Sequence, residues 1–338
     1  MNIAILGYGS IAQDHARTIL ALRRAPTWTD LRLYGVAGPS EESAAEFGLK
    51  FGMSEASTDP GHLLADPEVD AVIICSPTDL HAGQTEQALN AGKHVLCEIP
   101  LATSLAETDR LTRLAEKVDR RLMVCHTQRY SPALIEARRM VQVGELHPHS
   151  IVSRYMFGRR ENVNWRGRRR SWTDNLLWHH GCHAVDAALW LLGVADRGEA
   201  VETVSQIALP SGDLDIPMDL SLVLRTQRDQ IATIAMSYHT HISIHDYLII
   251  GEETTVLFAD SRLRDNERLL VDAPPSEGLE TPMARQDAEF FRAVREDREP
   301  AISGPSVRST MAVLQAAQDG LDARIAALGP QARHPREP

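Results

Sequence analysis

The sequence predicts an α/β N-terminal half with a parallel sheet, followed by an α+β half built on an open, mostly antiparallel sheet. Up to about residue 125, short apolar strands alternate with helices of about 10–15 residues, which is typical of βαβ units. Beyond about residue 200, strands follow one another with only turn signals between them. The chain has 338 residues, more than the roughly 100–200 of one domain, so two domains are expected.

The first element is an apolar strand over residues 2–6 that runs into a glycine turn. Gly7, Gly9 and Ala12 form the pattern Gly-x-Gly-x-x-Ala, with Ser10 and Ile11 inside it, and a helix follows. The first glycine permits the tight turn, the second lets the backbone approach a pyrophosphate, and the small third residue allows close packing of helix on strand. Strand, turn and helix occur in the required order, so we predict a Rossmann dinucleotide-binding site rather than a turn that binds nothing.

The remaining elements of the first half repeat this rhythm. Strands are expected at residues 31–37, 71–75, 94–97 and 122–125, and helices at 43–51, 79–91 and 104–118. The strands are short and mostly apolar and alternate with helices, which indicates a parallel sheet covered on both faces. We therefore place the end of the first domain near residue 130.

The second half, residues 131–328, begins and ends with helices around a run of strands. A helix over 132–143 stops at Gly144, and an apolar helix follows an Arg-rich stretch, at 176–192. Strands are expected at 200–208, 217–225, 229–238, 246–250, 253–258 and 267–272, and closing helices at 283–297 and 305–326. The polar tail, residues 329–338, is expected to be poorly ordered.

Composition excludes several classes of protein. With 35 basic and 46 acidic residues, the net charge is −11, which argues against a nucleic-acid or polybasic membrane-surface protein. No apolar run approaches the ~18 residues of a membrane helix, and the N-terminus enters a strand without a basic signal region. The four cysteines contain no C-x-x-C pair, so we expect a reduced, cytoplasmic protein without disulfides or structural zinc.

The choice between NAD and NADP depends on the end of the second strand. There, an Asp or Glu would bind the adenosine ribose of NAD, but the segment from Val36 to Ser40 has no carboxylate. This favours NADP, with Ser40 donating to the 2′-phosphate. Two alternatives stay open: Ser40 caps the next helix, or Glu41 reaches back to the ribose and NAD is the cofactor.

Three further motifs accompany the glycine turn: Cys75-Ser-Pro-Thr78 with His81, Cys97-Glu-Ile-Pro100, and Gly181-Cys-His183-x-x-Asp186. Together the four resemble the glucose-fructose oxidoreductase and inositol dehydrogenase family (Gfo/Idh/MocA), from residue 1 to about 325. The resemblance implies hydride transfer between a nicotinamide and a hydroxyl or aldehyde substrate, and a sheet often used for homo-oligomer contacts. It also implies cofactor contacts at Ser76, Thr78, His81, Glu98, Ile99 and Pro100.

The sequence departs from that family at two positions. The usual Glu-Lys-Pro is Glu98-Ile99-Pro100, which removes the lysine that contacts the reacting oxygen, and His179 replaces the family's aspartate. The run from Arg170 to His183 resembles one branch of the family. That branch implies oxidation, with NADP, of the cyclic hemiacetal of 4-carboxy-2-hydroxymuconate-6-semialdehyde to the lactone 2-pyrone-4,6-dicarboxylate, in protocatechuate 4,5-cleavage.

Histidine can supply the base that this reaction needs, because its ordinary pKa is about 6.5. His179 and His183 are four residues apart on one helix and share a face, whereas His180 points about 100° away. We assign catalysis to His179 and His183, leaving open which one takes the proton. A purely structural cluster is the alternative. No metal is expected, because no third ligand accompanies the pair.

Six arginines lie between residues 159 and 170 of this acidic chain, and guanidinium groups bind carboxylates in pairs of hydrogen bonds. Arg166, Arg168 and Arg169 are expected on a solvated loop. The predicted substrate-binding residues are Arg129, Arg160, Asn164, Arg170, Trp172 and His180. Two rival functions stay open: a dehydrogenase for a sugar acid, inositol or dihydrodiol, and a regulatory protein that binds NADP without turnover.

Overall fold

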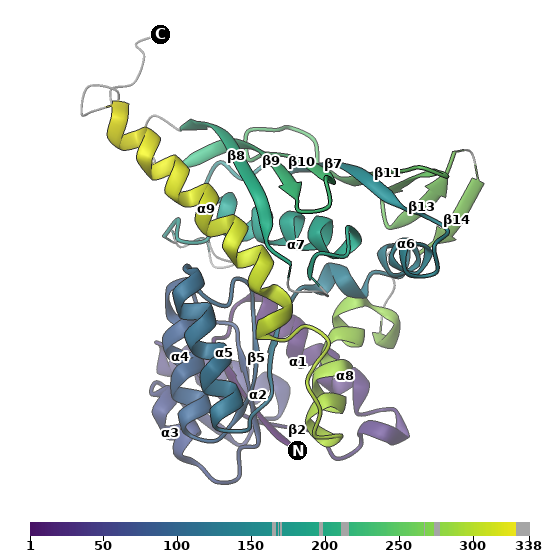
Figure 1. The fold of residues 1–338 in the computed structure, drawn as a ribbon. Coiled ribbons are helices and arrows are strands. Elements are labelled where there is room, and N and C mark those ends of the chain that lie inside the picture. Colours follow the sequence, from purple (N-terminus) through teal and green to yellow (C-terminus); the bar gives the residue numbers. More distant parts are fainter. Residues whose placement is uncertain are drawn as a thin grey trace. The chain divides into compact units, whose positions relative to one another are not determined.

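The computed structural model describes residues 1–163, 167, 169, 171–195, 199–210, 216–266, 268–273 and 278–328 (Figure 1). The chain forms two compact units. The first, called here the Rossmann unit, holds Met1–Tyr130 and Pro275–Pro305. The second, the sheet unit, holds Ser131–Val163, Arg169–Pro274 and Ser306–Pro338. None of the helices in the described ranges is long and apolar enough to cross a membrane.

The Rossmann unit contains a six-stranded parallel sheet in the order β3-β2-β1-β4-β5-β6. Its strands are β1 (Asn2–Leu6), β2 (Arg32–Ala37), β3 (Glu55–Ser57), β4 (Ala71–Ile74), β5 (His94–Cys97) and β6 (Leu122–Val124). The apolar residues of β1 and β4 are completely buried, as a sheet covered on both faces requires. The strand order reverses between β1 and β4, and ligands of such sheets bind at the carboxyl ends beside that point.

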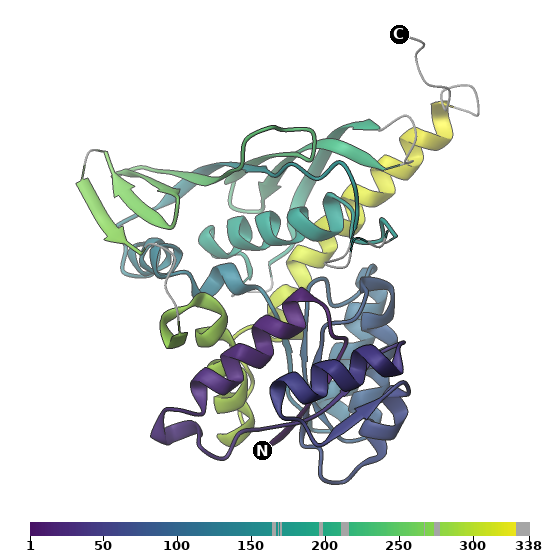
Figure 2. The same ribbon diagram turned by 180° about the vertical axis from the view of Figure 1, so that it is seen from behind.

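Helices cover this sheet and include one that comes from far along the sequence. They are α1 (Ser10–Leu22), α2 (Glu41–Phe51), α3 (Pro60–Ala65), α4 (Thr78–Asn90), α5 (Leu105–Lys117) and α8 (Pro282–Arg295), with short 3-10 turns η1 (Pro26–Trp28), η2 (Thr127–Tyr130) and η5 (Gly278–Glu280). Figure 2 shows α8 lying beside α1.

The expectation that residues 131–328 all belong to the second domain is wrong for the segment that carries α8. Pro275–Pro305 belongs to the Rossmann unit. The reason is the buried face of α8: Phe290 and Phe291 are fully buried, and Phe291 contacts Trp28 with ring centroids 6.3 Å apart. Residues 329–338, the expected tail, lie outside the described residues.

The sheet unit contains, among its described residues, eight strands in the order β14-β13-β12-β11-β7-β10-β9-β8. They are β7 (Pro148–Met156), β8 (Val201–Pro210), β9 (Pro217–Thr226), β10 (Ile231–Ser237), β11 (Ile244–Gly251), β12 (Thr255–Ala259), β13 (Arg262–Asp265) and β14 (Arg268–Asp272). Neighbours pair antiparallel except β7 with β10. The predicted open, mostly antiparallel sheet is therefore confirmed.

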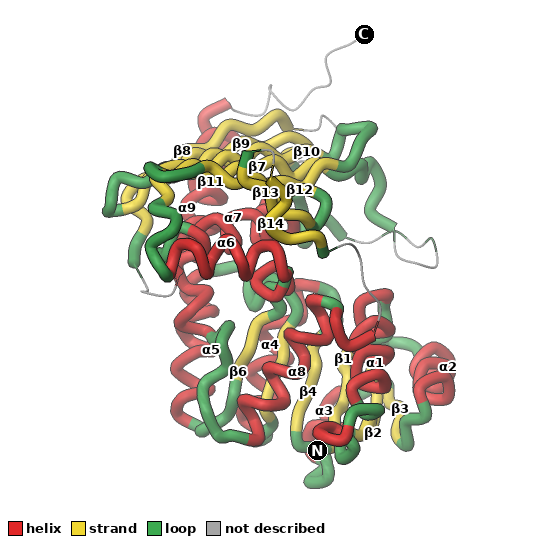
Figure 3. Tube along the Cα trace, turned by 90° about the vertical axis from the view of Figure 1, so that its right-hand side faces the viewer, coloured by secondary structure: helices red, strands yellow, loops and turns green. Residues whose placement is uncertain are grey.

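Helices pack against one face of this sheet (Figure 3). They include α6 (Pro132–Gln142) and α7 (Cys182–Leu191), and α9 (Gly304–Leu328) closes the described chain. Along β9, Leu220, Leu222 and Leu224 point inward and are at most 2% exposed, while the residues between them face outward. The helix expected over 176–192 differs at its start: Leu177–Gly181 form a π-helical turn, η3, before α7 begins.

Candidate active site

The glycine turn has the geometry that phosphate binding needs. Gly7 has φ +104°, and a Cβ there would lie 2.6 Å from the carbonyl oxygen of Cys75, so only glycine fits. A Cβ at Gly9 would meet nothing within 4 Å. Gly9 also precedes the first turn of α1, whose N–H groups have no intrahelical acceptor. The open space above Gly9 and these donors fit the pyrophosphate of a dinucleotide.

The end of β2 is organised by Tyr8, which the sequence analysis did not single out. Its ring fills the space beside Gly38, where any side chain would overlap it. Its hydroxyl oxygen accepts the Ser40 N–H at 3.1 Å. The Ser40 Oγ accepts the Ser43 N–H at 3.3 Å, so Ser40 is the N-cap of α2. Ser40 therefore has the capping role that was one of its alternatives. Because the cap uses only the oxygen of the hydroxyl group as an acceptor, the hydroxyl hydrogen can still donate to a phosphate.

The loops after β4 and β5 are tied together by His81. The ring is 2% exposed, with Nδ1 2.8 Å from the Pro100 carbonyl oxygen and Nε2 2.9 Å from that of Ser76. Ser76 donates to Gln84 at 2.6 Å, and Thr78 opens α4 with its side chain buried. His81 thus holds the two loops together, and both of its ring nitrogens face backbone carbonyls. Ile99 is 5% exposed.

A buried ion cluster, which we call the His15 cluster, links α1, β5 and α8. His15 Nδ1 lies 2.8 Å from Asp287 Oδ2, and Nε2 lies 3.1 Å from Glu98 Oε1. Burial by itself lowers the pKa of His15, but the charges and hydrogen bonds of Asp287 and Glu98 outweigh it and raise the pKa to about 10. His15 is therefore an imidazolium between two carboxylates.

The sequence analysis missed this cluster, although a signal exists for it. His15 and Asp287 interrupt the apolar stripes of α1 and α8, and a polar residue in such a stripe needs a buried partner. Among the described residues, His15, Glu98 and Cys125 also have the spacing of metal ligands. Both ring nitrogens of His15 already bond carboxylates, however, and burial raises the pKa of the Cys125 thiol well above its usual range. The cluster fits a proton network better than a metal site.

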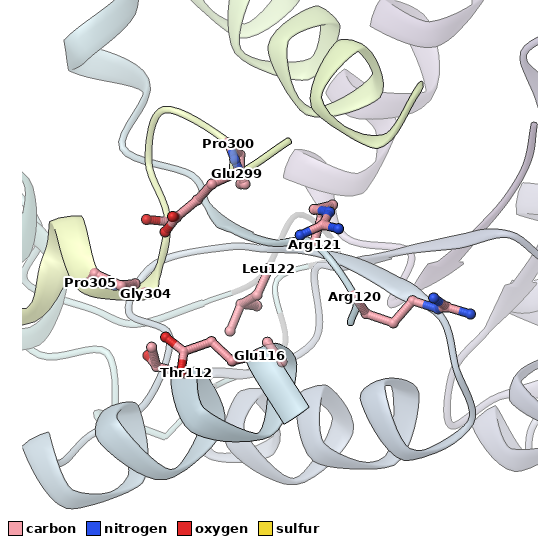
Figure 4. A pocket seen from close by; sticks show the side chains of 11 residues that line it. Thr112, Glu116, Arg120, Arg121, Leu122, Glu299, Pro300, Gly304 and Pro305 are labelled. Carbon is pink, nitrogen blue, oxygen red and sulfur yellow. The ribbon is translucent and has the colours of Figure 1, made fainter. Parts of the chain in front are cut away.

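A small cavity of about 90 Å³ lies elsewhere in the Rossmann unit (Figure 4). It is lined by α5, the start of β6 and the segment 299–305, including Glu116 and Glu299. The cavity is at the amino end of β6, whereas the glycine turn follows the carboxyl end of β1. It is also far smaller than the roughly 300 Å³ or more of a ligand pocket, so we assign it no role in cofactor binding.

The sheet unit gathers the predicted histidines in what we call the imidazole cluster. The π-helical turn is closed by the Gly181 N–H donating to the Leu176 carbonyl at 2.9 Å. The rings of His179 and His183 have centroids 6.0 Å apart, and His180 lies 4.7 Å from His179. His180 is expected to point about 100° away from the pair; its ring is buried and contacts that of His179. His179 and His183 remain half-buried.

Aromatic side chains from the strands surround this cluster. Tyr155 of β7 stacks on His180 with centroids 4.7 Å apart, and Tyr155 pairs across the sheet with His245 of β11 at 4.5 Å. Tyr238 meets the edge of His180 at 5.2 Å. Tyr155, Tyr238 and His245 were missed. Their signal is an aromatic or imidazole side chain in a strand or, for Tyr238, directly after one, and it becomes informative only once the register of the strands is known.

The buried histidines of the cluster are neutral. Burial, with the neighbouring imidazoles, lowers the pKa of His180 to about 2, and burial with His183 lowers that of His245 to about 4. His180 Nδ1 and His245 Nε2 are buried and have no hydrogen-bond partner within the part of the chain that the structure describes. Two polar atoms are thus left for a ligand. Asp186, beside His183, accepts a hydrogen bond from Thr310 at 3.1 Å.

The described arginines of the segment 159–170 differ in whether a carboxylate already pairs with them. Arg159 donates to Asp174 at 3.1 Å and to the Tyr238 hydroxyl at 3.2 Å, and its guanidinium lies over the Trp172 ring. Trp172 thus helps to hold Arg159. Arg160 is exposed and lies 2.9 Å from His241 Nε2, whereas Arg129 in η2 is 5% exposed. Asn164 and Arg170, with Arg166 and Arg168, lie outside the described residues.

Comparisons with known proteins identify the family. The GFO_IDH_MocA model, an oxidoreductase family with an NAD-binding Rossmann fold, matches residues 1–126, and the model of the C-terminal part of bacterial oxidoreductases matches 132–273. A 4-carboxy-2-hydroxymuconate-6-semialdehyde dehydrogenase of Sphingobium sp. is 32% identical over 93% of this chain and 96% of its own. The chain belongs to the Gfo/Idh/MocA oxidoreductase family. It is an NAD(P)-dependent oxidoreductase.

Other relatives in the family act on other substrates. An inositol 2-dehydrogenase of Acidothermus cellulolyticus is 26% identical over 90% of this chain and 87% of its own. Among solved structures, levoglucosan dehydrogenase in complex with NADH superimposes with a TM-score of 0.84, at 20% identity, over 96% of this chain and 97% of that one. The latter likeness establishes the fold.

Proposed function

We propose that this oxidoreductase converts the cyclic hemiacetal of 4-carboxy-2-hydroxymuconate-6-semialdehyde to 2-pyrone-4,6-dicarboxylate with NADP as oxidant. The observation that carries the proposal is the imidazole cluster, in which the half-buried His179 and His183 lie beside two neutral imidazoles, the buried His180 and the half-buried His245. The Sphingobium relative, similar along almost the whole chain, supports the same substrate.

The residues of this chain account for the proton. Oxidation removes a hydride from the hemiacetal carbon and a proton from its hydroxyl, and the carbon–oxygen bond becomes the lactone carbonyl. When bound, the nicotinamide accepts the hydride. The proton passes to His179 or His183, each with a lone pair on its ring when neutral. The aromatic enclosure of His180 and His245 keeps positive charge from accumulating next to that base, while their unpartnered nitrogens hold the substrate's polar atoms.

The substrate's carboxylates explain the arginines. Arg129, Arg160 and Arg170 are the proposed carboxylate partners, with Asn164, Trp172 and His180 completing the substrate site. Arg159 is excluded from this set, because Asp174 already pairs with it. Arg160 is exposed, and its side chain hydrogen-bonds the His239 carbonyl and His241, neither of which is a carboxylate.

NADP is proposed over NAD because the end of β2 carries no acidic side chain between Val36 and Ser40. The Ser40 hydroxyl and the first N–H groups of α2 are the groups that would hold the 2′-phosphate. The competing arrangement uses Glu41, which is exposed in the first turn of α2, to bind the ribose of NAD.

A homo-oligomer formed through the outer face of the sheet is also proposed. Val152, Val223, Ile207, Leu209 and Leu257 are between 36% and 67% exposed, on outward-facing positions of β7, β9, β8 and β12 of the same sheet. Adjacent exposed apolar residues of this kind mark an interaction surface. Sedimentation of the purified protein tests the proposal, with Ile207→Glu expected to shift it toward the monomer.

The catalytic proposal is tested by steady-state kinetics with both dinucleotides. We expect NADPH formation with the semialdehyde, a lower kcat/KM with NAD, and little activity on myo-inositol or glucose. Turnover of neutral polyols alone would instead favour the inositol-dehydrogenase function that the Acidothermus relative supports. Tight NADP binding without turnover of any of these substrates would favour a cofactor-sensing protein.

A further inference from the structure

Arg159, which lies shortly after the end of β7, is a charged side chain that the proposed function leaves without a task. It is 16% exposed and pairs with the Asp174 carboxylate, which is 7% exposed, at 3.1 Å. Its guanidinium lies over the rings of Trp172 and Tyr238, 5.5 Å from each centroid. A buried ion pair is weak evidence for stability, because the cost of desolvation offsets the attraction, but it holds its partners in one geometry.

The contact with Asp174 leads to the π turn that carries the predicted histidines. Asn175 is the next residue, and its Oδ1 accepts the N–H groups of Leu177 at 3.0 Å and Trp178 at 3.2 Å. The Asn175 carbonyl accepts the His179 N–H at 2.9 Å. The first hydrogen bonds of the turn therefore converge on the residue beside the one that Arg159 holds.

The contact with Tyr238 leads to the other side of the same turn. Arg159 donates to the Tyr238 hydroxyl at 3.2 Å through its side chain and to the Tyr238 carbonyl at 3.0 Å through its backbone N–H. Tyr238 is completely buried and meets the edge of the His180 ring at 5.2 Å. The His180 ring in turn contacts that of His179. Arg159 thus reaches the π turn both along the backbone and through a ring that packs on it.

We infer that Arg159 is a positioning residue for catalysis: through Asp174 and Tyr238 it sets where the π turn places His179 and His180. The inference rests on the proposed function, because it takes His179 or His183 as the base. A displacement of about 1 Å in a catalytic group can cost about a hundredfold in rate, so a residue need not touch the substrate to control kcat.

The test is Arg159→Lys, which keeps a positive charge beside Asp174 but loses the planar fork and its stacking on the two rings. We expect kcat to fall about tenfold, while the KM for the semialdehyde and the dissociation constant of NADP+ change less than about threefold. The solvent deuterium isotope effect on kcat should rise, because proton transfer to a displaced base becomes slower.

Arg154→Lys is the matched control. Arg154 lies on β7 and also pairs with an aspartate, Asp246, but it is 53% exposed and points to the outer face of the sheet. Its substitution should leave kcat and the isotope effect unchanged. A fall of kcat in both variants would mean that any loss of an Arg–Asp pair disturbs this unit, which would overturn the inference.

Rescue by free guanidinium tests the position of the charge directly. Arg159→Ala leaves a space between Trp172 and Tyr238 next to the Asp174 carboxylate, and guanidinium below denaturing concentrations should restore part of its kcat. The same addition should not raise the kcat of Arg154→Ala. If neither Arg159 variant is folded by thermal unfolding, Tyr238→Phe replaces them: it keeps the buried ring, removes the hydroxyl that Arg159 binds, and should lower kcat in the same direction.

Two kinetic results would overturn the inference: an unchanged kcat in the folded variants, or a higher KM with unchanged kcat, which would make Arg159 a substrate-binding residue. If the parent protein does not oxidise the semialdehyde, the proposed function fails, and diethyl pyrocarbonate decides the inference instead. This reagent acylates accessible neutral imidazoles, and His180 is 7% exposed. It should modify His180 faster in Arg159→Lys than in the parent or Arg154→Lys; equal rates would overturn the inference.

Discussion

Two buried histidines of this protein, His15 and His180, differ in charge. His15 in the Rossmann unit is completely buried and is an imidazolium, because Asp287 and Glu98 accept from its two nitrogens. His180 in the sheet unit is also buried, but its neighbours are Tyr155, other imidazoles and Tyr238, and it is neutral. Burial alone does not set the charge of a histidine; the partners that share its burial do.

Because of this difference in charge, we expect the two units to have different roles. A fixed ion cluster can orient a cofactor electrostatically but cannot take up a proton, because every nitrogen is committed. The imidazole cluster contains His179 and His183, the residues proposed to take up the proton that oxidation of a hydroxyl releases. Substitutions in the sheet unit should therefore change turnover, and substitutions in the Rossmann unit should change cofactor binding.

The largest effect is expected from His179→Ala. Loss of a general base costs about 10²- to 10⁴-fold, so kcat should fall by at least a hundredfold, while the dissociation constant for NADP+ stays within a factor of two. Steady-state kinetics and calorimetry measure the two quantities. His183→Ala is the companion variant, and the more damaging of the two identifies the base; unchanged kcat in both would remove the imidazole cluster from catalysis.

In the Rossmann unit, Gly9→Ala and Gly7→Ala form a matched pair. A Cβ at Gly9 has open space in the free protein, so the melting temperature should not change, but the methyl group occupies the place proposed for the pyrophosphate. We expect about a tenfold or greater loss of NADP+ affinity, equivalent to ~1.4 kcal/mol. In Gly7→Ala, the new Cβ would overlap the Cys75 carbonyl oxygen, and the alanine would have to adopt a positive φ. This variant should therefore have a free energy of unfolding lower by about 1–3 kcal/mol. Normal cofactor binding by Gly9→Ala would contradict the assignment of the turn.

Arg170→Ala should raise the KM for the semialdehyde, or lower kcat/KM, by about tenfold, because a carboxylate loses a charged partner worth roughly 1.5–3 kcal/mol. Arg169→Ala, one residue away and expected on the solvated loop, is the control. Equal kinetics for the two variants would place Arg170 outside the carboxylate site.

The smallest expected effect is on the pH dependence of the free energy of unfolding. His180 and His245 have folded-state pKa values of about 2 and 4, below the ~6.5 of an unfolded histidine. At pH values between the folded-state and unfolded-state pKa, the unfolded chain therefore binds more protons than the folded chain. The contribution of these two neutral histidines to the free energy of unfolding is present above pH 6.5 and is lost as the pH falls toward 4. His15, with a raised pKa, behaves in the opposite way: its contribution is present below pH 6.5 and is lost as the pH rises toward 10.

Denaturant unfolding between pH 4 and 9 measures these effects. His180→Phe keeps an aromatic ring in the enclosure and removes the titrating group, so its stability should decline less between pH 6.5 and 4 than that of the parent protein. An identical acid decline in both would mean that His180 is protonated in the folded state.

The sequence was sufficient for the parallel sheet, because fully apolar strands and the glycine turn are local signals. It was not sufficient for β7, whose Ser150, Ser153 and Arg154 break the apolar alternation although the strand lies inside the sheet. Nor could it bring α8 to α1, since Asp287 and His15 are 272 residues apart and no local pattern links them.

For the site, the sequence was sufficient for the histidines of residues 179–183 and the absent lysine at Ile99. It missed Tyr155, Tyr238 and His245, because their proximity depends on strand register, and it predicted a regular helix where the π turn lies. The residues found from sequence are those proposed to carry the chemistry, and Tyr155, Tyr238 and His245, found only from structure, lie around them.

Product analysis with the semialdehyde tests the central proposal most directly. The protein should form 2-pyrone-4,6-dicarboxylate and NADPH in equal amounts, because the hemiacetal is oxidised while the ring is closed. Formation of the open-chain acid instead of the lactone, or no product from the semialdehyde while inositol is oxidised, would contradict it.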